Sequence, residues 1–398
     1  MNRKKYLWMA MNHFLFLFYF ALTTIFYYLA IQQGNNGVTF KILGGGDDGY
    51  FYWVEAKKVA VGDEAVLTSV YPLMIGYLFK ITGIESPYLI RFFNFFGFII
   101  LYLISLQIIK LFQKVDQSIS RVNSNDNLNS YILLTGCYFL YVSFVMNLNL
   151  SIIRDVWIYT VYLLSLMTSI IIMFCTRTNK MLYTFALLPC LWFLGELRGY
   201  ALVSFILSII IYLLYRRFFK SRKSVVLLLI LCSFGFYYTF FIDLKIYYLN
   251  KSLRDALNYR HSAFIDSNGS QMWIQLDQGN FFSFILQYIH SYLGNMIGPL
   301  PWHITGMNTF IIFLFESIPM IFILMFIYSK RSLLSDPLKY TLLHAFVWFG
   351  LIAITNDNIG TATRLRAVGW IPILIVFTKL YTESKRKSNQ LLTTGEWK

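Results

Sequence analysis

The stretch MNRKKYLWMAMNHFLFLFYFALTTIFYYLAI, residues 1–31, decides the class of fold. After a basic start, the run from residue 6 to residue 31 carries no acidic side chain, lysine or arginine. A helix needs roughly 20 predominantly apolar residues to cross a bilayer. The run is too long for the apolar part of a cleavable signal peptide, and it lacks a cleavage site of small residues. We therefore expect a first membrane anchor that stays on the chain.

The rest of the chain has the same character. Of its 398 residues, 57% are apolar and only 13% are charged, whereas soluble domains average about 45–50% and about 25%. The formal net charge of +15 comes from basic residues in short loops between apolar runs. This pattern favours cytoplasmic loops facing anionic lipid over a nucleic-acid partner. The four scattered cysteines predict neither a disulfide framework nor a metal site. The composition therefore predicts an all-α polytopic membrane protein.

Long apolar runs recur along the sequence and predict about ten membrane-spanning helices within a single integral membrane domain, residues 1–398. Two large external loops, residues 32–87 and 242–305, separate some of the spans. Both termini are expected in the cytoplasm, because most lysines and arginines then lie inside. Residues 281–302 are nearly long enough for an eleventh span, which would place the basic tail outside, so we assign them to the outer interface or a re-entrant position. The predicted spans are 6–31, 88–113, 131–147, 152–175, 181–195, 200–215, 223–241, 306–329, 337–355 and 367–382.

The first external loop contains an acidic motif, LGGGDDGYFYWVEAKKV, residues 43–59. Residues 48–60 and 70–82 each predict a short amphipathic surface helix, and the two would cap a cavity in the bilayer. A carboxylate at this boundary is partly desolvated, which raises its pKa and suits a general base. The alternative for Asp48 is an N-cap of the following helix, so Asp47 is the favoured base.

Arginines and carboxylates also occur beside the outer ends of three later spans. Planar guanidinium groups bind phosphate through two parallel hydrogen bonds, so the arginines are candidates for binding a phosphate or pyrophosphate. Each pair also has a simpler interpretation. Arg154 and Asp155 would pair at the start of a helix, and Glu196 and Arg198 would form a solvated pair in a turn. Arg364 and Arg366 would anchor lipid headgroups. The residues are Arg154 and Asp155, Glu196 and Arg198, and Arg364 and Arg366.

A rigid aromatic segment, MIGPLPWHITG at residues 296–306, contains Trp302 and His303. Tryptophan faces stack on sugar rings and on polyprenyl chains, so the segment would suit the wall of a sugar or lipid pocket. The alternative is an interfacial aromatic belt, which is common in membrane proteins. His303 is expected to be a polar loop residue and not a metal ligand.

The order of a first span, an acidic external loop and a second span resembles the GT-C superfamily of integral membrane glycosyltransferases. It is most similar to the bacterial branch related to dolichyl-phosphate-mannose protein mannosyltransferases and polysaccharide enzymes. The segments that carry the resemblance are GGGDDGYFYWVEA (44–56), GDEAVLTSVYPLMIGYLFKITG (62–83), SIIRDVWIYTVYLLSL (151–166), ELRGYALVSFILSII (196–210), GPLPWHI (298–304) and NIGTATRLRAVGWIPIL (358–374).

The resemblance implies a polyprenyl-phosphate-linked sugar donor and a glycan or lipid-linked acceptor in the cell envelope. The active face would lie outside the bacterial plasma membrane. An aspartate of the first loop, Asp47 or Asp48, would act on the acceptor hydroxyl while arginines hold the donor phosphate. The chain departs from many relatives because it lacks a large soluble C-terminal domain and a second acidic loop beyond Asp155. The acceptor, and a requirement for Mg²⁺ or Mn²⁺, are therefore left open.

Three other functions compete with sugar transfer. A repeat-unit polymerase of an exopolysaccharide or O-antigen pathway would join lipid-pyrophosphate oligosaccharides on the same face, and the sequence does not separate it from a transferase. A lipid-linked oligosaccharide flippase or another transporter would show charges at the bilayer midplane and inverted repeats, and neither is visible. A non-catalytic assembly subunit would tolerate the loss of both aspartates.

Overall fold

The computed structural model describes residues 3–41, 48–117, 125–176, 178–218, 223–246, 250–265, 270–276 and 279–394. These residues are almost entirely helical, and the extended pairings among them are isolated bridges. The predicted all-α class is confirmed for this part of the chain. The bridges join Thr39 to Ser151, Ile246 to Lys251 and Gln271 to Asn358.

Seven helices in the described part of the chain are long and apolar enough to cross a membrane, and up to nine if each of two bent pairs is one span. Every predicted span lies on such a helix, on a bent pair, or on α10 (Lys223–Phe240). The fold is therefore that of a polytopic helical membrane protein, while ten crossings stay a prediction. The seven are α1 (Arg3–Gln32), α4 (Pro87–Gln117), α7 (Asp155–Phe174), α8 (Lys180–Leu197), α9 (Gly199–Phe218), α15 (Asp336–Thr355) and Met307–Ser329, which comprises α13 (Met307–Ile312), η2 (Phe313–Ser317) and α14 (Ile318–Ser329). The bent pairs are α5 (Asn125–Leu140) with α6 (Val142–Leu150), and α16 (Ile359–Leu365) with α17 (Ala367–Thr394).

Short helices form in both predicted external loops. The two expected in the first loop are present as α2 (Gly49–Val61) and α3 (Tyr71–Thr82). Helix α2 ends at Gly62, whose φ of 90° is a left-handed conformation that glycine adopts without a steric penalty. The second loop contains α11 (Leu253–Ile265), α12 (Phe281–Ile297) and η1 (Pro301–His303), and η3 (Arg331–Leu333) follows α14. Helix α12 stops before Gly298 and Pro299, so the run 281–302 does not form one continuous helix.

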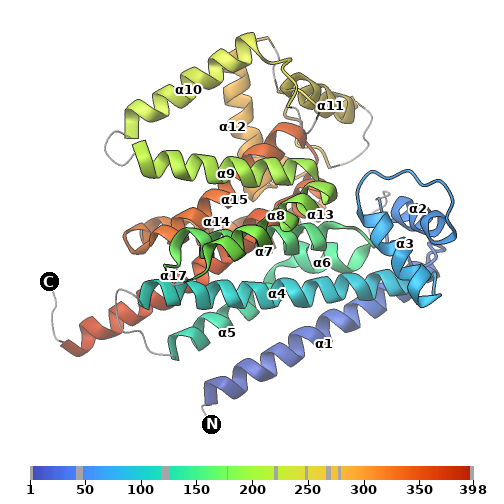
Figure 1. Ribbon diagram of the computed structural model, residues 1–398, viewed down its shortest axis with the longest axis horizontal. Coiled ribbons are helices and arrows are strands. Elements are labelled where there is room, and N and C mark those ends of the chain that lie inside the picture. Colours follow the sequence, from blue (N-terminus) through green and yellow to red (C-terminus); the bar gives the residue numbers. More distant parts are fainter. Residues whose placement is uncertain are drawn as a thin grey trace. The chain divides into compact units, whose positions relative to one another are not determined.

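The chain divides into two compact units, and each is described by itself. The first unit comprises Met1–Arg198, Leu324–Thr341 and Ile371–Lys398. In it α4 packs against both α1 and α7, α8 packs on α7, and α2 packs on α3 (Figure 1). Buried polar side chains bond between helices: Thr23 donates to the Asn149 side chain over 2.7 Å. Such bonds between helices are typical of membrane bundles.

The second unit comprises Gly199–Ile323 and Leu342–Trp370. Helix α12 packs against α10 and α16. An apolar core joins these three helices to α11 and to the extended segment 271–276. Its buried members are Tyr238, Ile242, Leu257, Met272, Ile274, Leu276, Phe284, Ile359 and Ala362. The core therefore anchors α11 and the segment 271–276 onto the other helices of this unit.

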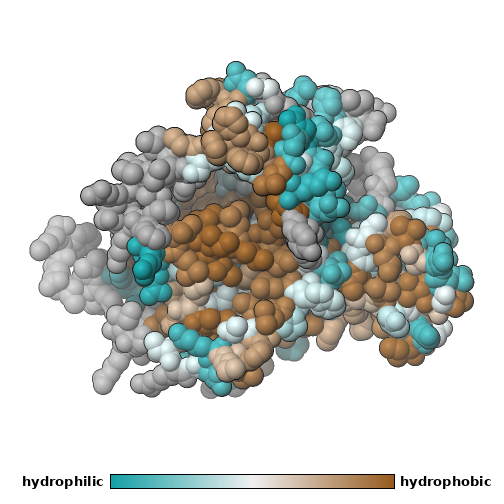
Figure 2. Space-filling model, turned by 45° about the horizontal axis from the view of Figure 1, so that its top comes forward, coloured by the Kyte–Doolittle hydropathy of each residue, from teal (hydrophilic) through white to brown (hydrophobic). Residues whose placement is uncertain are grey.

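The exposed surface is strongly apolar. Figure 2 shows hydrophobic residues running across the face in view, with hydrophilic residues gathered in separate groups. On α8 the exposed side chains Met181, Phe185, Leu188 and Trp192 recur at spacings of three and four residues and so share one face of the helix. Phe322 and Met325 do the same on α14. Surfaces of this kind are suited to contact with lipid.

Candidate functional site

In the first unit, charged side chains from several segments meet at the buried ring of Tyr52 on α2. The ring lies in the electrostatic field of Arg154, Asp48, Asp155 and Arg198. The guanidinium carbon of Arg154 lies 5.6 Å from the ring centre, which is a cation–π distance. We call these five residues the Tyr52 cluster. It joins the first external loop, the start of α7 and the turn between α8 and α9, so four predicted site residues lie together.

An ion pair between Asp155 and Arg198 forms the buried part of this cluster. Arg198 Nη1 lies 3.6 Å from Asp155 Oδ1, and the two side chains are 11% and 3% exposed. Asp155 begins α7, where the helix dipole favours a carboxylate. A buried charge is retained when an opposite charge pairs with it. The ion pair therefore fixes the turn at Arg198 to the start of α7.

Burial raises the pKa of the Tyr52 phenol to about 12. Arg154 and Arg198 act in the opposite direction, while Asp48 and Asp155 add to the rise. The phenol thus stays protonated near neutral pH and offers a hydrogen-bond donor. The ring of Tyr71 stands edge-on to that of Tyr52, with 5.3 Å between centres. Burial raises the pKa of Tyr71 as well, so both phenols are neutral.

Asn94 on α4 ties the segments around the cluster together. Its side-chain oxygen accepts from Tyr71 (3.0 Å) and from the Trp157 indole (3.2 Å), and its amide donates to the Ile153 carbonyl (2.9 Å). One side chain thus joins α3, α7 and the residues just before Arg154. Sequence reasoning missed Asn94, although a buried amide within an otherwise apolar span was a usable signal.

Arg91, three residues earlier on the same face of α4, pins two chain segments side by side. Its guanidinium donates to the carbonyls of Gly37 (2.8 Å) and Val38 (3.0 Å), and also to those of Asn149 and Leu150. The first segment leads to the acidic motif, and the second leads to Arg154. Arg91 therefore helps to set the path of both predicted catalytic segments, and sequence reasoning missed it as well.

The predicted acidic residues have different outcomes. Asp47 lies outside the described residues, so its role as a base stays a prediction. Asp48 is exposed and directly precedes α2, and its side chain makes no capping hydrogen bond to that helix. Glu196 contributes through its main chain, because its carbonyl accepts from the Val70 amide over 3.2 Å and so joins the C-terminal end of α8 to the start of α3.

A further carboxylate, Glu55, holds the loop between α2 and α3. It accepts from Lys58 Nζ (2.8 Å) and from the Val66 amide (2.6 Å). These two hydrogen bonds lower the pKa of Glu55, and the contribution of Lys58 is the larger. The loop that follows α2 is therefore fastened to the helix.

The remaining predicted residues lie in the second unit. Arg366 is completely buried and donates to the Glu316 carboxylate and to the Gly298 carbonyl. Glu316 sits in the π-helical turn η2, a form often found at functional or strained positions. Arg364 is half-buried at the end of α16. Sequence reasoning missed Glu316, although a carboxylate within a predicted span indicates a charged partner.

Trp302 and His303 form an aromatic group with His290 of α12. The imidazoles of His290 and His303 stack with 5.1 Å between centres, and the exposed Trp302 indole donates to His290 Nε2 over 2.8 Å. His303 is buried, and this burial, together with His290, lowers the pKa of His303 to about 4. His303 is therefore neutral at physiological pH.

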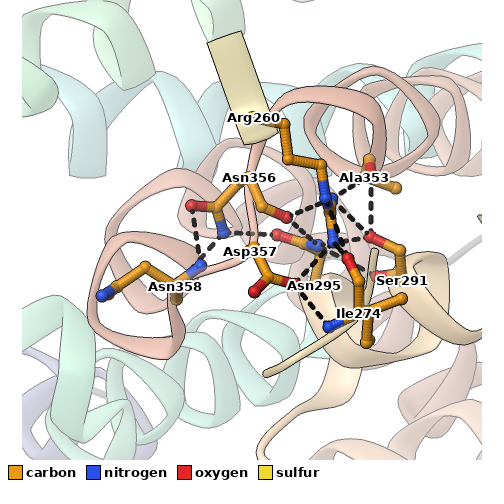
Figure 3. A network of polar contacts seen from close by, with 8 residues as sticks. All are labelled: Arg260, Ile274, Ser291, Asn295, Ala353, Asn356, Asp357 and Asn358. Carbon is orange, nitrogen blue, oxygen red and sulfur yellow. Dashed lines mark hydrogen bonds and ion pairs between the residues drawn. The ribbon is translucent and has the colours of Figure 1, made fainter. Parts of the chain in front are cut away.

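A second buried arginine–carboxylate pair, which the sequence did not predict, organises the second external loop (Figure 3). Arg260 of α11 bonds Asp357 Oδ1 at 2.6 Å, and the two side chains are 3% and 4% exposed. Arg260 also donates to the carbonyls of Ile274 (2.7 Å), Ala353 (2.8 Å) and Asn356 (2.6 Å). Because its partners lie on several elements, Arg260 fastens α11 and segment 270–276 to the end of α15.

No group of three or more His, Cys, Asp and Glu side chains suited to a metal ion occurs in the described part of the chain. Comparison of the chain with protein-family models, curated proteins and solved structures finds no match.

Proposed function

We propose that this protein is a membrane glycosyltransferase of the GT-C type. It would transfer a sugar from a polyprenyl-phosphate-linked donor to a cell-surface glycan or a lipid-linked acceptor on the outer face of the membrane. The observation that supports this function best is the Tyr52 cluster, in which two arginines and two carboxylates meet beside neutral phenols. Transfer from a sugar phosphate requires cations for the phosphate and a carboxylate for the acceptor hydroxyl.

In the proposed reaction the acceptor oxygen forms a bond to the anomeric carbon as the bond from that carbon to the phosphate oxygen breaks. The acceptor proton passes to the carboxylate of Asp47 or Asp48. The electron pair of the broken bond remains on the departing polyprenyl phosphate. The two candidates for the base are Asp48, which is exposed at the edge of the cluster, and Asp47, which lies outside the described residues. The preference for Asp47 loses its reason, because the Asp48 side chain does not cap α2.

Arg154 and Arg198 are the residues proposed to bind the donor phosphate, with Asp155 positioning Arg198. A hydrogen bond to a charged group contributes about 1.5–3 kcal/mol, so two arginines would contribute about 3–6 kcal/mol. If this contribution is made in the transition state, it corresponds to roughly two to four powers of ten in rate. Arg364, Trp302 and His303 lie in the second unit, and we give them no step in this reaction. We assign Arg366 a structural role, since it is buried against Glu316.

The test uses the full-length protein in lipid nanodiscs with radiolabelled polyprenyl-phosphate hexoses and extracted cell-envelope glycan. With the wild type we expect labelled glycan and released polyprenyl phosphate. One of the two variants, Asp47→Asn or Asp48→Asn, should form neither product. Asp63→Asn is the matched control, because this exposed aspartate lies on the same loop beyond α2. Full activity in both variants of the acidic motif would overturn the base assignment.

Deletion of the gene separates the competing functions in cells. A glycan that lacks one sugar decoration supports the proposed transferase. Accumulated single repeat units on lipid pyrophosphate would instead indicate a polymerase. Lipid-linked intermediates retained on the inner face would indicate a flippase, and either of these results would overturn the proposal.

A further inference from the structure

The extended segment between α11 and α12 directs one tryptophan outward. Met272, Ile274 and Leu276 are buried in the apolar core of the second unit, whereas Trp273 is 62% exposed. The exposed Trp273 thus lies between two buried neighbours, Met272 and Ile274. Burial of the three apolar neighbours therefore places the Trp273 indole on the surface of the loop.

The backbone at Trp273 is strained. Its φ is 59°, in the left-handed region that is sterically unfavourable for a bulky side chain. The other two described residues with positive φ that are not glycine are Asn36 and Asn250, and asparagine tolerates this region. Glycine is the residue that fits such a position without cost. A tryptophan here is therefore unfavourable for folding, and strained backbone residues are often found at binding sites.

Main-chain hydrogen bonds to Asp357 hold the segment around Trp273. The amides of Trp273 and Ile274 both donate to this carboxylate, the latter over 3.1 Å, and the Met272 amide donates to the Asp357 carbonyl over 2.7 Å. Arg260 holds Asp357 from the other side. Consecutive amides that converge on one anion form a concave turn of this kind. A glycine at position 273 would make the same hydrogen bonds, so the network does not require the indole.

The surroundings of Trp273 are polar. Gln275, on the same side of the segment, is exposed and lies 3.4 Å from His261 of α11, measured between side-chain nitrogens. The other exposed residues of α11 include the polar Asn258 and Ser262 and the aromatic Tyr259, which is 60% exposed. This surface differs from the exposed apolar faces of α8 and α14. An aromatic ring beside amide and imidazole groups matches a sugar better than an acyl chain, because sugars combine an apolar C–H face with hydroxyl groups.

We propose that Trp273, with Gln275 and His261, forms a binding platform for neutral pyranose oligosaccharides. The indole stacks on the C–H face of one sugar ring, and the amide and imidazole bond its hydroxyl groups. The platform follows from the geometry of the second unit alone.

The test measures saccharide binding without any donor, using the full-length protein in nanodiscs. Mannohexaose and cellohexaose are the probes, and saturation-transfer NMR and calorimetry are the readouts. At least one probe should bind the wild type, and Trp273→Gly should weaken that binding at least tenfold without lowering the midpoint of thermal unfolding. Trp273→Tyr should retain most of the binding. Trp192→Ala, which removes an equally exposed tryptophan from α8, is the matched control and should bind normally.

Each other result overturns the platform. If neither probe binds the wild type, or if Trp273→Gly binds as well as the wild type, the site is wrong. Earlier thermal unfolding of Trp273→Gly would show a structural role, and weaker association with lipid vesicles with unchanged sugar binding would show a membrane anchor. The binding assay contains no donor, so its result does not depend on the transfer reaction. Saccharide binding without transferase activity would contradict only the proposed reaction. Transferase activity without saccharide binding would contradict only the platform.

Discussion

Replacement of Arg260 by methionine should destabilise the second unit by about 3–5 kcal/mol, the usual cost of removing one partner of a buried ion pair. Methionine has a similar length and keeps the apolar contacts of the side chain. The guanidinium, however, bonds the Asp357 carboxylate and three main-chain carbonyls, those of Ile274, Ala353 and Asn356. Without it, the carboxylate and the carbonyls of Ile274, Ala353 and Asn356 lose a buried donor (Figure 3).

The loss should depend on pH. Burial raises the pKa of Asp357, and Arg260 is the first of the groups that oppose the rise. In Arg260→Met the pKa of Asp357 should rise further, because the desolvation remains and the cation is gone. An acid whose pKa is higher in the folded state binds protons more tightly there, so the folded state gains stability as the pH falls. Part of the stability of Arg260→Met should therefore return when the pH is lowered from 8 toward 5.

Denaturant unfolding in nanodiscs of the wild type, Arg260→Met, Asp357→Asn and the double variant measures the coupling between the two residues. The double variant should be more stable than the sum of the single losses predicts, because it leaves no unpaired charge. Arg254→Met is the control on the same helix, since the Arg254–Asp243 pair is largely exposed and should change stability little. Strict additivity, or a loss in Arg260→Met no larger than that in Arg254→Met, would refute the reasoning.

Two further predictions concern protonation and the first external loop. The unfolding free energy should fall as the pH drops from about 6.5 to about 4. Burial and His290 lower the pKa of His303 to about 4 in the folded protein. The unfolded chain therefore binds a proton more tightly than the folded one over this range of pH. His303→Phe should flatten this part of the profile, and an unchanged slope would contradict the explanation. Glu55→Gln should loosen the loop after α2 and speed hydrogen exchange of the Val66 amide, whereas unchanged exchange would remove the fastening role of Glu55. In the wild type the same loosening should appear as the pH falls through the pKa of Glu55, which Lys58 and the Val66 amide hold below its ordinary value.

The helices were predictable because membrane spans depend on local composition. A run of about 20 apolar residues is long enough to cross a membrane as a helix, and the ten predicted runs all coincide with helices or bent pairs. The bends were not predictable. Helices α16 and α17 meet at 51° beside Arg366, whose partner Glu316 lies 50 positions earlier in the chain. Hydropathy records how well a segment suits lipid and carries no information about such a distant partner.

The candidate site was predictable in part for the same reason. The positive-inside rule placed Asp48, Arg154, Asp155 and Arg198 on one side, and they do meet at one cluster. The rule sets the end of a helix at which a residue lies but not the direction in which its side chain points. The central position of Tyr52 was therefore missed. The pairing of Arg260 with Asp357, 97 positions apart, depends on tertiary packing and was missed as well.

The strain at Trp273 and the network around Arg260 are two parts of one energetic arrangement. A left-handed backbone at a bulky residue costs about 1–3 kcal/mol, and it persists when its surroundings fix it from several sides. The buried pair that fixes it, Arg260 with Asp357, has an expected loss of about 3–5 kcal/mol when one partner is removed. The second quantity exceeds the first, so the network can hold the backbone of residue 273 in a conformation that tryptophan resists. Glycine would meet the same hydrogen bonds without that cost, so the network around Arg260 does not by itself select tryptophan at this position.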